Sequence, residues 1–378
     1  MKEAVIAGYV RSPFHFANKG ELTKVRPDDL AAAVVKALVA KTGIDPKEIE
    51  DLLLGCAFPE GEQGFNVARL IDLIADLPQS VAGATINRFC GSSMQAVHSA
   101  AGAIAIGAGD VFICAGVESM TRVPMLGFNP MPNPALAERL PAAYISMGTT
   151  AENVAKKYGI SREEQDAFAV ESQAKATAAR QAGKLKDEIT PINNGKDTVV
   201  SDGCIREGTT LEALAGLKPA FDEHGVVTAG TSSPLTDGAA ACLVTSAEYA
   251  KAHGLKPLAK VKSVAVAGCA PEIMGIGPVA ATQKALKRAG LTIDDVDVIE
   301  LNEAFAAQAL ACMRDLKIDP KKVNLDGGAI AIGHPLGATG ARITGKAAAL
   351  LKREGKQFAL STQCIGGGQG IATILEAV

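Results

Sequence analysis

Short apolar runs alternate along the chain with longer runs in which alanine-rich apolar positions recur every three or four residues. A first β-type run at Val5–Ile6 precedes a helical pattern near Asp28–Lys41, and buried strands are predicted at Asp51–Leu54 and Asp110–Cys114. Strands that alternate with amphipathic helices are typical of proteins whose sheets are covered by helices. The pattern therefore predicts an α/β fold.

One part of this pattern occurs twice. The segment Gly43–Leu54 resembles Gly290–Leu301, and each follows an alanine- and lysine-containing helix and ends in a strand. Phe58 and Phe305 stand at the same offset after the two strands. The shared order of helix, turn and strand favours duplication of a half-domain over a chance match. Two similar halves meet at one interface, and ligand sites favour such interfaces.

The middle of the chain differs from both halves. Residues 120–147 hold five prolines and little periodicity, as in a functional or disordered loop. Helical patterns follow at Thr150–Tyr158 and Ser161–Gly183, the second with a Ser161/Glu164 capping box. We therefore expect three units: a first half at 1–118 plus about 226–248, an inserted loop domain at 119–225, and a second half at 249–378.

Composition narrows the class of protein. The chain has 378 residues, 48% of them hydrophobic and 21% charged, which indicates a globular protein with an ample core. The net charge of −3 argues against a nucleic-acid partner, since bulk binding to nucleic acid requires a basic surface. None of the eight cysteines forms a C-x-x-C pair, so no metal site is predicted.

The cellular context follows from the same features. A long chain with scattered cysteines is typical of reduced thiols in the cytoplasm, and we expect a cytoplasmic protein. The N-terminal run is too short and too acidic for a signal peptide, and the last residues are not a peroxisomal address. No apolar run approaches the ~20 residues of a membrane span, so none is predicted.

The first segment with candidate chemistry is Asn87–Val97. A β-type run ends near Ile86, and a helix of small residues is predicted just after Cys90. A helix N-terminus favours a thiolate, and its free N–H groups can bind a carbonyl oxygen that becomes negative. Cys90 is therefore a candidate nucleophile; a buried inert cysteine ahead of a tightly packed helix is the alternative.

The second segment is Gly327–Arg342, in which His334 stands in a Gly/Pro turn ahead of an apolar helix. The chain has only five histidines, and a neutral imidazole suits acceptance of a thiol proton. A turn histidine that only forms hydrogen bonds is the alternative. The interval from Gly340 to Lys346 matches a phosphate-binding loop, but Ala347 replaces the required Ser/Thr, so that interpretation is rejected.

Two further segments carry polar or glycine-rich patterns. Cys364–Gly370 follows a predicted strand, and its glycines allow close approach to a ligand without forming a dinucleotide fingerprint. Cys364 is a candidate second acid or base; a glycine hairpin with an incidental cysteine is the alternative. Asn302 and Glu303 follow the repeated strand, where a polar pair can line a site or cap the next helix; taken alone, they favour the cap.

Together these four segments resemble the thiolases, which cleave or form 3-ketoacyl-CoA thioesters. The match spans the whole chain and keeps the order of the motifs, and the blocks at 87–96, 147–154, 161–169 and 228–240 are most similar to bacterial degradative members. The resemblance implies the thiolase fold, five α/β/α/β/α layers from two similar halves with an inserted loop domain.

The resemblance also implies roles for the candidate residues. Cys90 is implied as the acyl-carrying nucleophile, His334 as its base, and Cys364 as the group that moves a proton at the α-carbon of acetyl-CoA. Asn302 would hold a water that forms one oxyanion hole with His334. The N–H groups of Cys90 and Gly366 would form the other.

Coenzyme A enters this chemistry as a substrate, and no covalently bound cofactor is implied. The resemblance points to four CoA contacts: Arg206, Ser233, Met147 and Phe305. The alternatives are a surface charge for Arg206, a turn hydroxyl for Ser233, and core packing for Met147 and Phe305. Ser146 stands where short-chain biosynthetic thiolases tend to have histidine, which weakens an acetoacetyl-CoA-specific interpretation.

Three functions are compared. The first is a degradative 3-ketoacyl-CoA thiolase of fatty-acid β-oxidation. The second is a biosynthetic acetoacetyl-CoA thiolase, and the third is a non-catalytic acyl-CoA- or lipid-binding protein. The presence of Cys90, Asn302, His334 and Cys364 favours the first two over the third. As partners the resemblance implies acyl-CoA substrates and CoA, a homodimer or homotetramer and, in some degradative members, a hydratase/dehydrogenase subunit.

Overall fold

Two groups of strands lie at the centre of the computed structural model, which describes residues 1–378. The first group has the order β1–β8–β5–β3–β4 and the second β9–β12–β11–β10, and a short β1–β9 pairing at Val5 and Ile6 joins them. The first group comprises β1 Ala4–Arg11, β3 Asp51–Gly55, β4 Ala82–Ile86, β5 Val111–Ser119 and β8 Thr236–Ser246. The second comprises β9 Ala259–Gly268, β10 Val298–Leu301, β11 Phe358–Ile365 and β12 Gln369–Glu376. Outside these groups, β2 His15–Phe16 pairs with β8, and β6 Ile192–Asn193 pairs with β7 Thr198–Val199.

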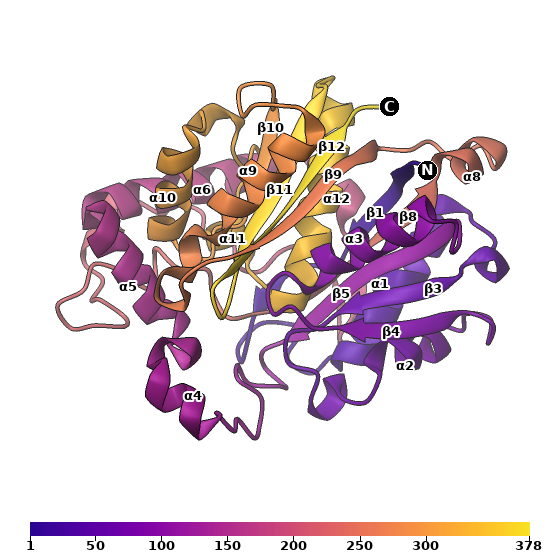
Figure 1. Ribbon diagram of the computed structural model, residues 1–378. Coiled ribbons are helices and arrows are strands. Elements are labelled where there is room, and N and C mark those ends of the chain that lie inside the picture. The colour runs from indigo at the N-terminus through magenta and orange to yellow at the C-terminus, as the bar shows by residue number, and fades with distance from the viewer.

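Helices cover both groups of strands and fill the space between them (Figure 1). The outer helices are α1 Pro27–Thr42 and α2 Val67–Ile74 on the first group, and α9 Gly277–Ala289 and α10 Ala306–Leu316 on the second; α3 Ser92–Ala105 and α12 Leu336–Glu354 lie between the groups. Leu52 and Leu54 point into the outer core and Leu53 into the middle one, because successive strand residues face opposite sides. The predicted five-layered α/β/α/β/α arrangement is confirmed.

The two repeated segments have matching local structure. Gly43 ends α1 and Gly290 ends α9, both in the left-handed region with φ values of 69° and 70°. Each is followed by a turn and then by a strand, β3 in the first half and β10 in the second.

The two central helices approach each other very closely. A Cβ atom at Gly340 of α12 would lie 2.2 Å from Met94 N of α3, so only glycine fits there. The Ser93 hydroxyl accepts a hydrogen bond from Ala341 N at 2.8 Å. Because α3 follows Cys90 and α12 follows His334, this contact fixes the two candidate catalytic residues relative to each other.

The inserted region is largely helical. It contains α4 Pro134–Arg139, η3 Pro141–Tyr144, α5 Met147–Tyr158, α6 Arg162–Gln181, η4 Lys186–Glu188 and α7 Leu211–Ala215. The predicted Ser161/Glu164 capping box is confirmed. The expectation of an aperiodic loop at 120–147 was only partly right, because Asn133 caps α4 and proline occupies its first turn.

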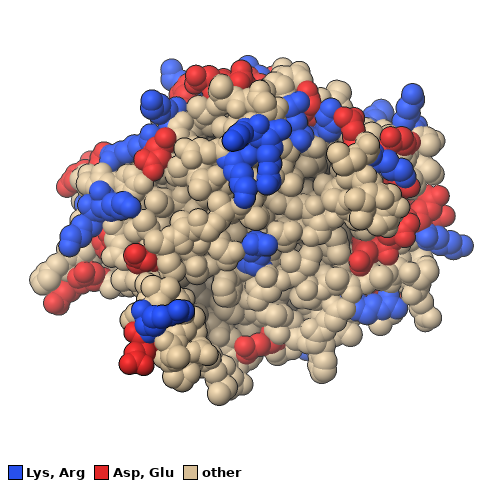
Figure 2. Space-filling view, viewed as in Figure 1, with Lys and Arg blue, Asp and Glu red and all other residues tan.

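The remaining elements are short: η1 Pro46–Glu48, η2 Gly61–Gln63, α8 Ala247–Ala252, η5 Pro271–Ile276, η6 Pro320–Lys322 and α11 Ala329–Ile332. All eight cysteines are free, and all except Cys269 are buried. Figure 2 shows acidic and basic side chains mainly near the rim of the viewed face, with a group of basic side chains that extends from the upper part toward the centre. No helix has both the length and the apolar character needed to cross a membrane.

Candidate active site

Cys90 lies in the tight turn between β4 and α3. Phe89 has a left-handed backbone (φ 43°), and its N–H donates to the Asn87 side chain at 2.8 Å. The same side chain donates to Ala57 O at 3.0 Å, which anchors the turn to the end of β3. A non-glycine residue with positive φ is costly and is kept where the surroundings enforce it. The strained turn holds Cys90 directly ahead of the helix, as the sequence predicted.

The Cys90 thiol is buried, with 9% of the residue exposed. Burial raises its pKa to about 11, although hydrogen bonds from the N–H of Gly366 and from its own N–H lower it; the Glu118 carboxylate adds to the rise. The expected favouring of a thiolate by the helix is therefore outweighed by desolvation. The group is therefore a thiol in the free protein, and it requires a base before it can attack.

The N–H groups of Cys90 and Gly366, which are predicted to form one oxyanion hole, both lower the pKa of this thiol. Gly366 belongs to the turn between β11 and β12, where Gly367 and Gly368 have φ values of 78° and 84°. The Gln363 side chain donates to Cys90 O, so strand β11 is tied directly to the nucleophile turn. Segments 273 positions apart in the chain thus meet at the Cys90 turn.

Cys364 lies near the end of β11 and is 1% exposed. Burial and the neighbouring Cys90 thiol hold its pKa well above the usual range, so it too is a protonated thiol. Its side chain belongs to an apolar cluster with Met147 and Phe305. These two predicted CoA contacts therefore form the wall beside the second cysteine.

His334 lies in the turn between α11 and α12 and is 4% exposed. Burial, with a smaller effect of Arg342, lowers its pKa to about 3, so the ring is neutral near pH 7. Its Nδ1 lies 2.6 Å from the Thr339 hydroxyl, which itself donates to Pro335 O at 3.0 Å. Since that hydroxyl proton is engaged, Nδ1 is the donor and Nε2 keeps the lone pair.

Asn302 faces the free nitrogen of this ring. Its Nδ2 lies 3.4 Å from His334 Nε2, and its buried Oδ1 has no hydrogen-bond partner. The expectation of a helix cap was wrong, because α10 begins only at Ala306 and its N-terminus has no side-chain cap. Backbone pairing of Asn302 with Thr362 at 3.0 Å instead holds the amide at the end of the strands.

The remaining predicted CoA contacts lie differently. The half-buried Ser233 donates its N–H to Ala304 O at 2.9 Å, next to Phe305. Arg206 contacts Gln173 in the inserted region, and no contact joins it to Cys90, His334 or Cys364. Its Nε is buried without a partner, and burial lowers its pKa. Arg206 is thus a cation whose charge no carboxylate of the chain neutralises.

Sequence reasoning missed two supporting side chains. Thr339 fixes the His334 ring, and Glu118 lies beneath the site. The Glu118 carboxylate accepts hydrogen bonds from Ala57 N and Gly337 N at 2.9 Å each, and so joins the loops on both sides of the site. A single acid within an apolar strand run, and a hydroxyl in the first turn of the helix after His334, were the available signals. The structure contains no group of three or more residues suited to hold a metal ion.

The protonation state of Cys90 leads to a testable prediction. The rate of its alkylation by iodoacetamide should rise about tenfold per pH unit between roughly pH 7 and pH 9, because the thiolate fraction rises until the pKa of about 11 is reached. Mass spectrometry of the Cys90 peptide measures the rate, with Cys90→Ser as the blank. A rate that is already flat near neutral pH would instead indicate a thiolate–imidazolium pair.

The chain is similar to known proteins over its whole length. The model for "Thiolase, N-terminal domain" matches residues 4–248, and that for "Thiolase, C-terminal domain" matches residues 255–377. A protein named 3-ketoacyl-CoA thiolase from Bacillus subtilis is 50% identical, with all of both chains covered, and one from Marinobacter nauticus is 50% identical over all of this chain and 99% of its own. The crystal structure of human mitochondrial 3-ketoacyl-CoA thiolase superposes with a TM-score of 0.92 at 38% identity, covering 100% of this chain and 99% of that one.

Proposed function

The chain belongs to the thiolase family, and from that premise we propose that it is a 3-ketoacyl-CoA thiolase, an acyltransferase that cleaves 3-ketoacyl-CoA with CoA into acetyl-CoA and a shortened acyl-CoA. One observation carries the proposal. The Cys90 sulfur, the Gly366 N–H and the Cys364 thiol come together from opposite halves of the chain, and the His334–Asn302 pair supplies a neutral base.

In the first half-reaction, His334 Nε2 accepts the Cys90 proton and the sulfur attacks the 3-keto carbon. The carbon–carbon bond then breaks, and its electron pair forms the enolate of acetyl-CoA. Cys364 gives its proton to the α-carbon, and the acyl group stays on Cys90 as a thioester. Two buried thiols with raised pKa values suit these roles, because each holds its proton until a step requires it.

In the second half-reaction the proton that His334 took from Cys90 passes to the Cys364 thiolate, and Nε2 then accepts the proton of the incoming CoA thiol. The CoA sulfur attacks the thioester, and the Cys90 sulfur leaves and regains a proton from His334. The N–H groups of Cys90 and Gly366 stabilise the oxyanion that develops at one position. Asn302 and His334 stabilise the oxyanion that develops at the other position.

For the substrate we propose that Met147 and Phe305 pack along the pantetheine arm of CoA, that Ser233 contacts the same arm, and that Arg206 pairs with the nucleotide end. The cluster of Met147 and Phe305 with Cys364 supports the first assignment. The unpaired, half-buried guanidinium supports the last. We further propose the division of the chain at 1–118 plus 226–248, 119–225 and 249–378.

The degradative direction is tested by chain length. We expect kcat/KM for thiolysis to be higher for medium and long 3-ketoacyl-CoA substrates than for acetoacetyl-CoA. Ser146 supports this expectation, because short-chain biosynthetic thiolases tend to have histidine there, whereas the Ser146 hydroxyl is the N-cap of α5 and accepts from Thr149 N at 3.2 Å. A series of substrates of increasing length, assayed at one CoA concentration, measures it. A sharp preference for acetoacetyl-CoA would favour the biosynthetic function instead.

A further inference from the structure

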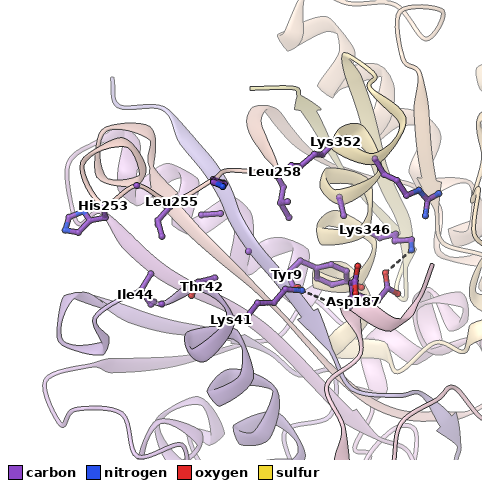
Figure 3. A pocket seen from close by; sticks show the side chains of 18 of the residues that line it. Tyr9, Lys41, Thr42, Ile44, Asp187, His253, Leu255, Leu258, Lys346 and Lys352 are labelled. Carbon is purple, nitrogen blue, oxygen red and sulfur yellow. Dashed lines mark hydrogen bonds and ion pairs between the residues drawn. The ribbon is translucent and has the colours of Figure 1, made fainter. Parts of the chain in front are cut away.

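A large cavity lies away from Cys90, beside the far end of α12 (Figure 3). Its volume is about 1070 Å³, enough for a ligand of the size of a nucleotide. Lys346, Leu350 and Arg353 of α12 line it. At a rise of ~1.5 Å per residue, Lys346 lies roughly 18 Å from His334 along the axis of α12. The cavity is therefore separate from the thiol site.

Several parts of the chain meet at this cavity. Its walls come from β1, the end of α1, η4, α12 and the segment that joins α8 to β9. That segment, residues 253–258, begins between the two thiolase-domain matches, which end at 248 and begin at 255, and continues into the second. Interfaces of this kind are preferred places for ligand sites.

The cavity has an excess of unpaired positive charge. Lys184, Lys256 and Lys352 line it, and their ammonium groups form neither an ion pair nor a hydrogen bond. Lys41 donates only to main-chain oxygens, those of Tyr9 at 3.2 Å and Asp187 at 2.5 Å, and burial lowers its pKa. These four ammonium groups are not neutralised by a contact with any carboxylate.

The carboxylates of the lining are mostly engaged elsewhere. Glu188 binds Arg11 and Lys346. Glu48 accepts from the Tyr249 hydroxyl and lies 3.5 Å from His253 Nε2. Asp45 accepts a hydrogen bond from Lys47 N at 2.9 Å. Of the four carboxylates that line the cavity, only that of Asp187 therefore has no partner. The balance favours an anionic ligand.

The Tyr9 hydroxyl points to the same conclusion. Tyr9 is 3% exposed, and its hydroxyl has no hydrogen-bond partner. A buried hydroxyl without a partner is unfavourable, so the protein retains it where a ligand can pair with it. Figure 3 shows Tyr9, Lys41, Asp187 and Lys346 gathered at one end of the cavity.

The opposite end of the cavity is apolar and aromatic. Ile44, Leu255 and His253 lie there in Figure 3. The ring of His253 is stacked on that of Tyr249 with 3.9 Å between centroids. A flat ring packs well against such a wall. The ligand therefore needs phosphate-like charge at one end and a flat ring at the other.

We propose that this cavity binds a nucleoside diphosphate or a metabolite that contains one, at a site separate from that of the thiols. The diphosphate lies among the unpaired lysines and accepts the Tyr9 hydroxyl proton in a hydrogen bond, and the base packs on the His253–Tyr249 wall.

Titration calorimetry with ADP tests the proposal. We expect Lys256→Glu with Lys352→Glu to weaken ADP binding by about tenfold or more, since two attractive charges become repulsive. A matched pair at exposed lysines outside the cavity, Lys287→Glu with Lys321→Glu, should change it less than twofold. Inorganic pyrophosphate should bind at least tenfold more weakly than ADP. An ADP titration of the cavity variant that superimposes on that of the unchanged protein would overturn the site, and equal affinity for pyrophosphate would overturn the role of the base.

A second variant separates binding from folding. Tyr9→Phe removes a hydroxyl that has no partner, so we expect an unchanged or higher melting temperature together with ADP binding weakened several-fold. Unweakened binding would contradict the assigned role of the hydroxyl. Thiolysis is assayed in parallel, and kcat/KM should stay the same in every variant. If the unchanged protein catalyses thiolysis but does not bind ADP, this proposal fails and the proposed function stands; if it binds ADP but does not catalyse thiolysis, the reverse holds.

Discussion

Replacement of Cys90 by alanine is expected to lower kcat for thiolysis on the order of 10⁴-fold or more, because the sulfur forms the covalent bond on which both half-reactions depend. The fold should survive the change. The Cys90 side chain packs in a small cluster with Ala17, Ala57, Met120 and Leu336, and loss of one sulfur atom there should cost about 1 kcal/mol. The assay is steady-state thiolysis with the melting temperature measured alongside.

Cys114→Ala provides a matched control. Cys114 is fully buried in the middle core and takes no part in the proposed chemistry, so this variant loses similar packing but should keep its activity. Incubation of the unchanged enzyme with acetyl-CoA should also add an acetyl mass to the Cys90 peptide. If Cys90→Ala keeps more than about one per cent of the activity, or if Cys364 is acetylated instead, then Cys90 is not the nucleophile.

Local sequence patterns predicted the positions of Cys90 and His334 well. A β-type run before Ile86 and small residues after Cys90 place the thiol between strand and helix, and the structure has β4 ending at Ile86 and α3 beginning at Ser92. Glycine and proline around His334 mark the turn that precedes α12. These predictions succeeded because chain direction and helix starts are set by neighbouring residues.

The assembly of the site was beyond such patterns. Cys364 meets Cys90 only because β11 hydrogen-bonds to the nucleophile turn through Gln363, a contact that no local pattern encodes. From its local pattern alone Asn302 was expected to cap a helix, because its contact is with a histidine 32 residues later in the chain. The protonation state of Cys90 also depends on desolvation by distant segments, which overrides the helix effect that the sequence suggested.

Replacement of Thr339 by valine is the second change with a large expected effect. The side chains have nearly the same shape, and Pro335 O still accepts hydrogen bonds from Ala338 N at 2.9 Å and Thr339 N at 3.1 Å, so no acceptor is left unpaired. What is lost is the hydroxyl that holds the proton on His334 Nδ1. The ring can then place its proton on Nε2, where it blocks acceptance of a thiol proton. We expect kcat to fall about 10²-fold.

The test separates this positioning role from a structural one. Thr339→Ser keeps the hydroxyl and should restore most of the activity, and KM for CoA should stay the same in both variants. Nitrogen-15 NMR of His334 should show protonated Nδ1 in the unchanged enzyme and Thr339→Ser, and a shift toward protonated Nε2 in Thr339→Val. Alkylation of Cys90 by iodoacetamide should not change, because burial sets its pKa. Full activity of Thr339→Val, or an equal loss in Thr339→Ser, would show that the hydroxyl does not fix the tautomer on which deprotonation of Cys90 depends.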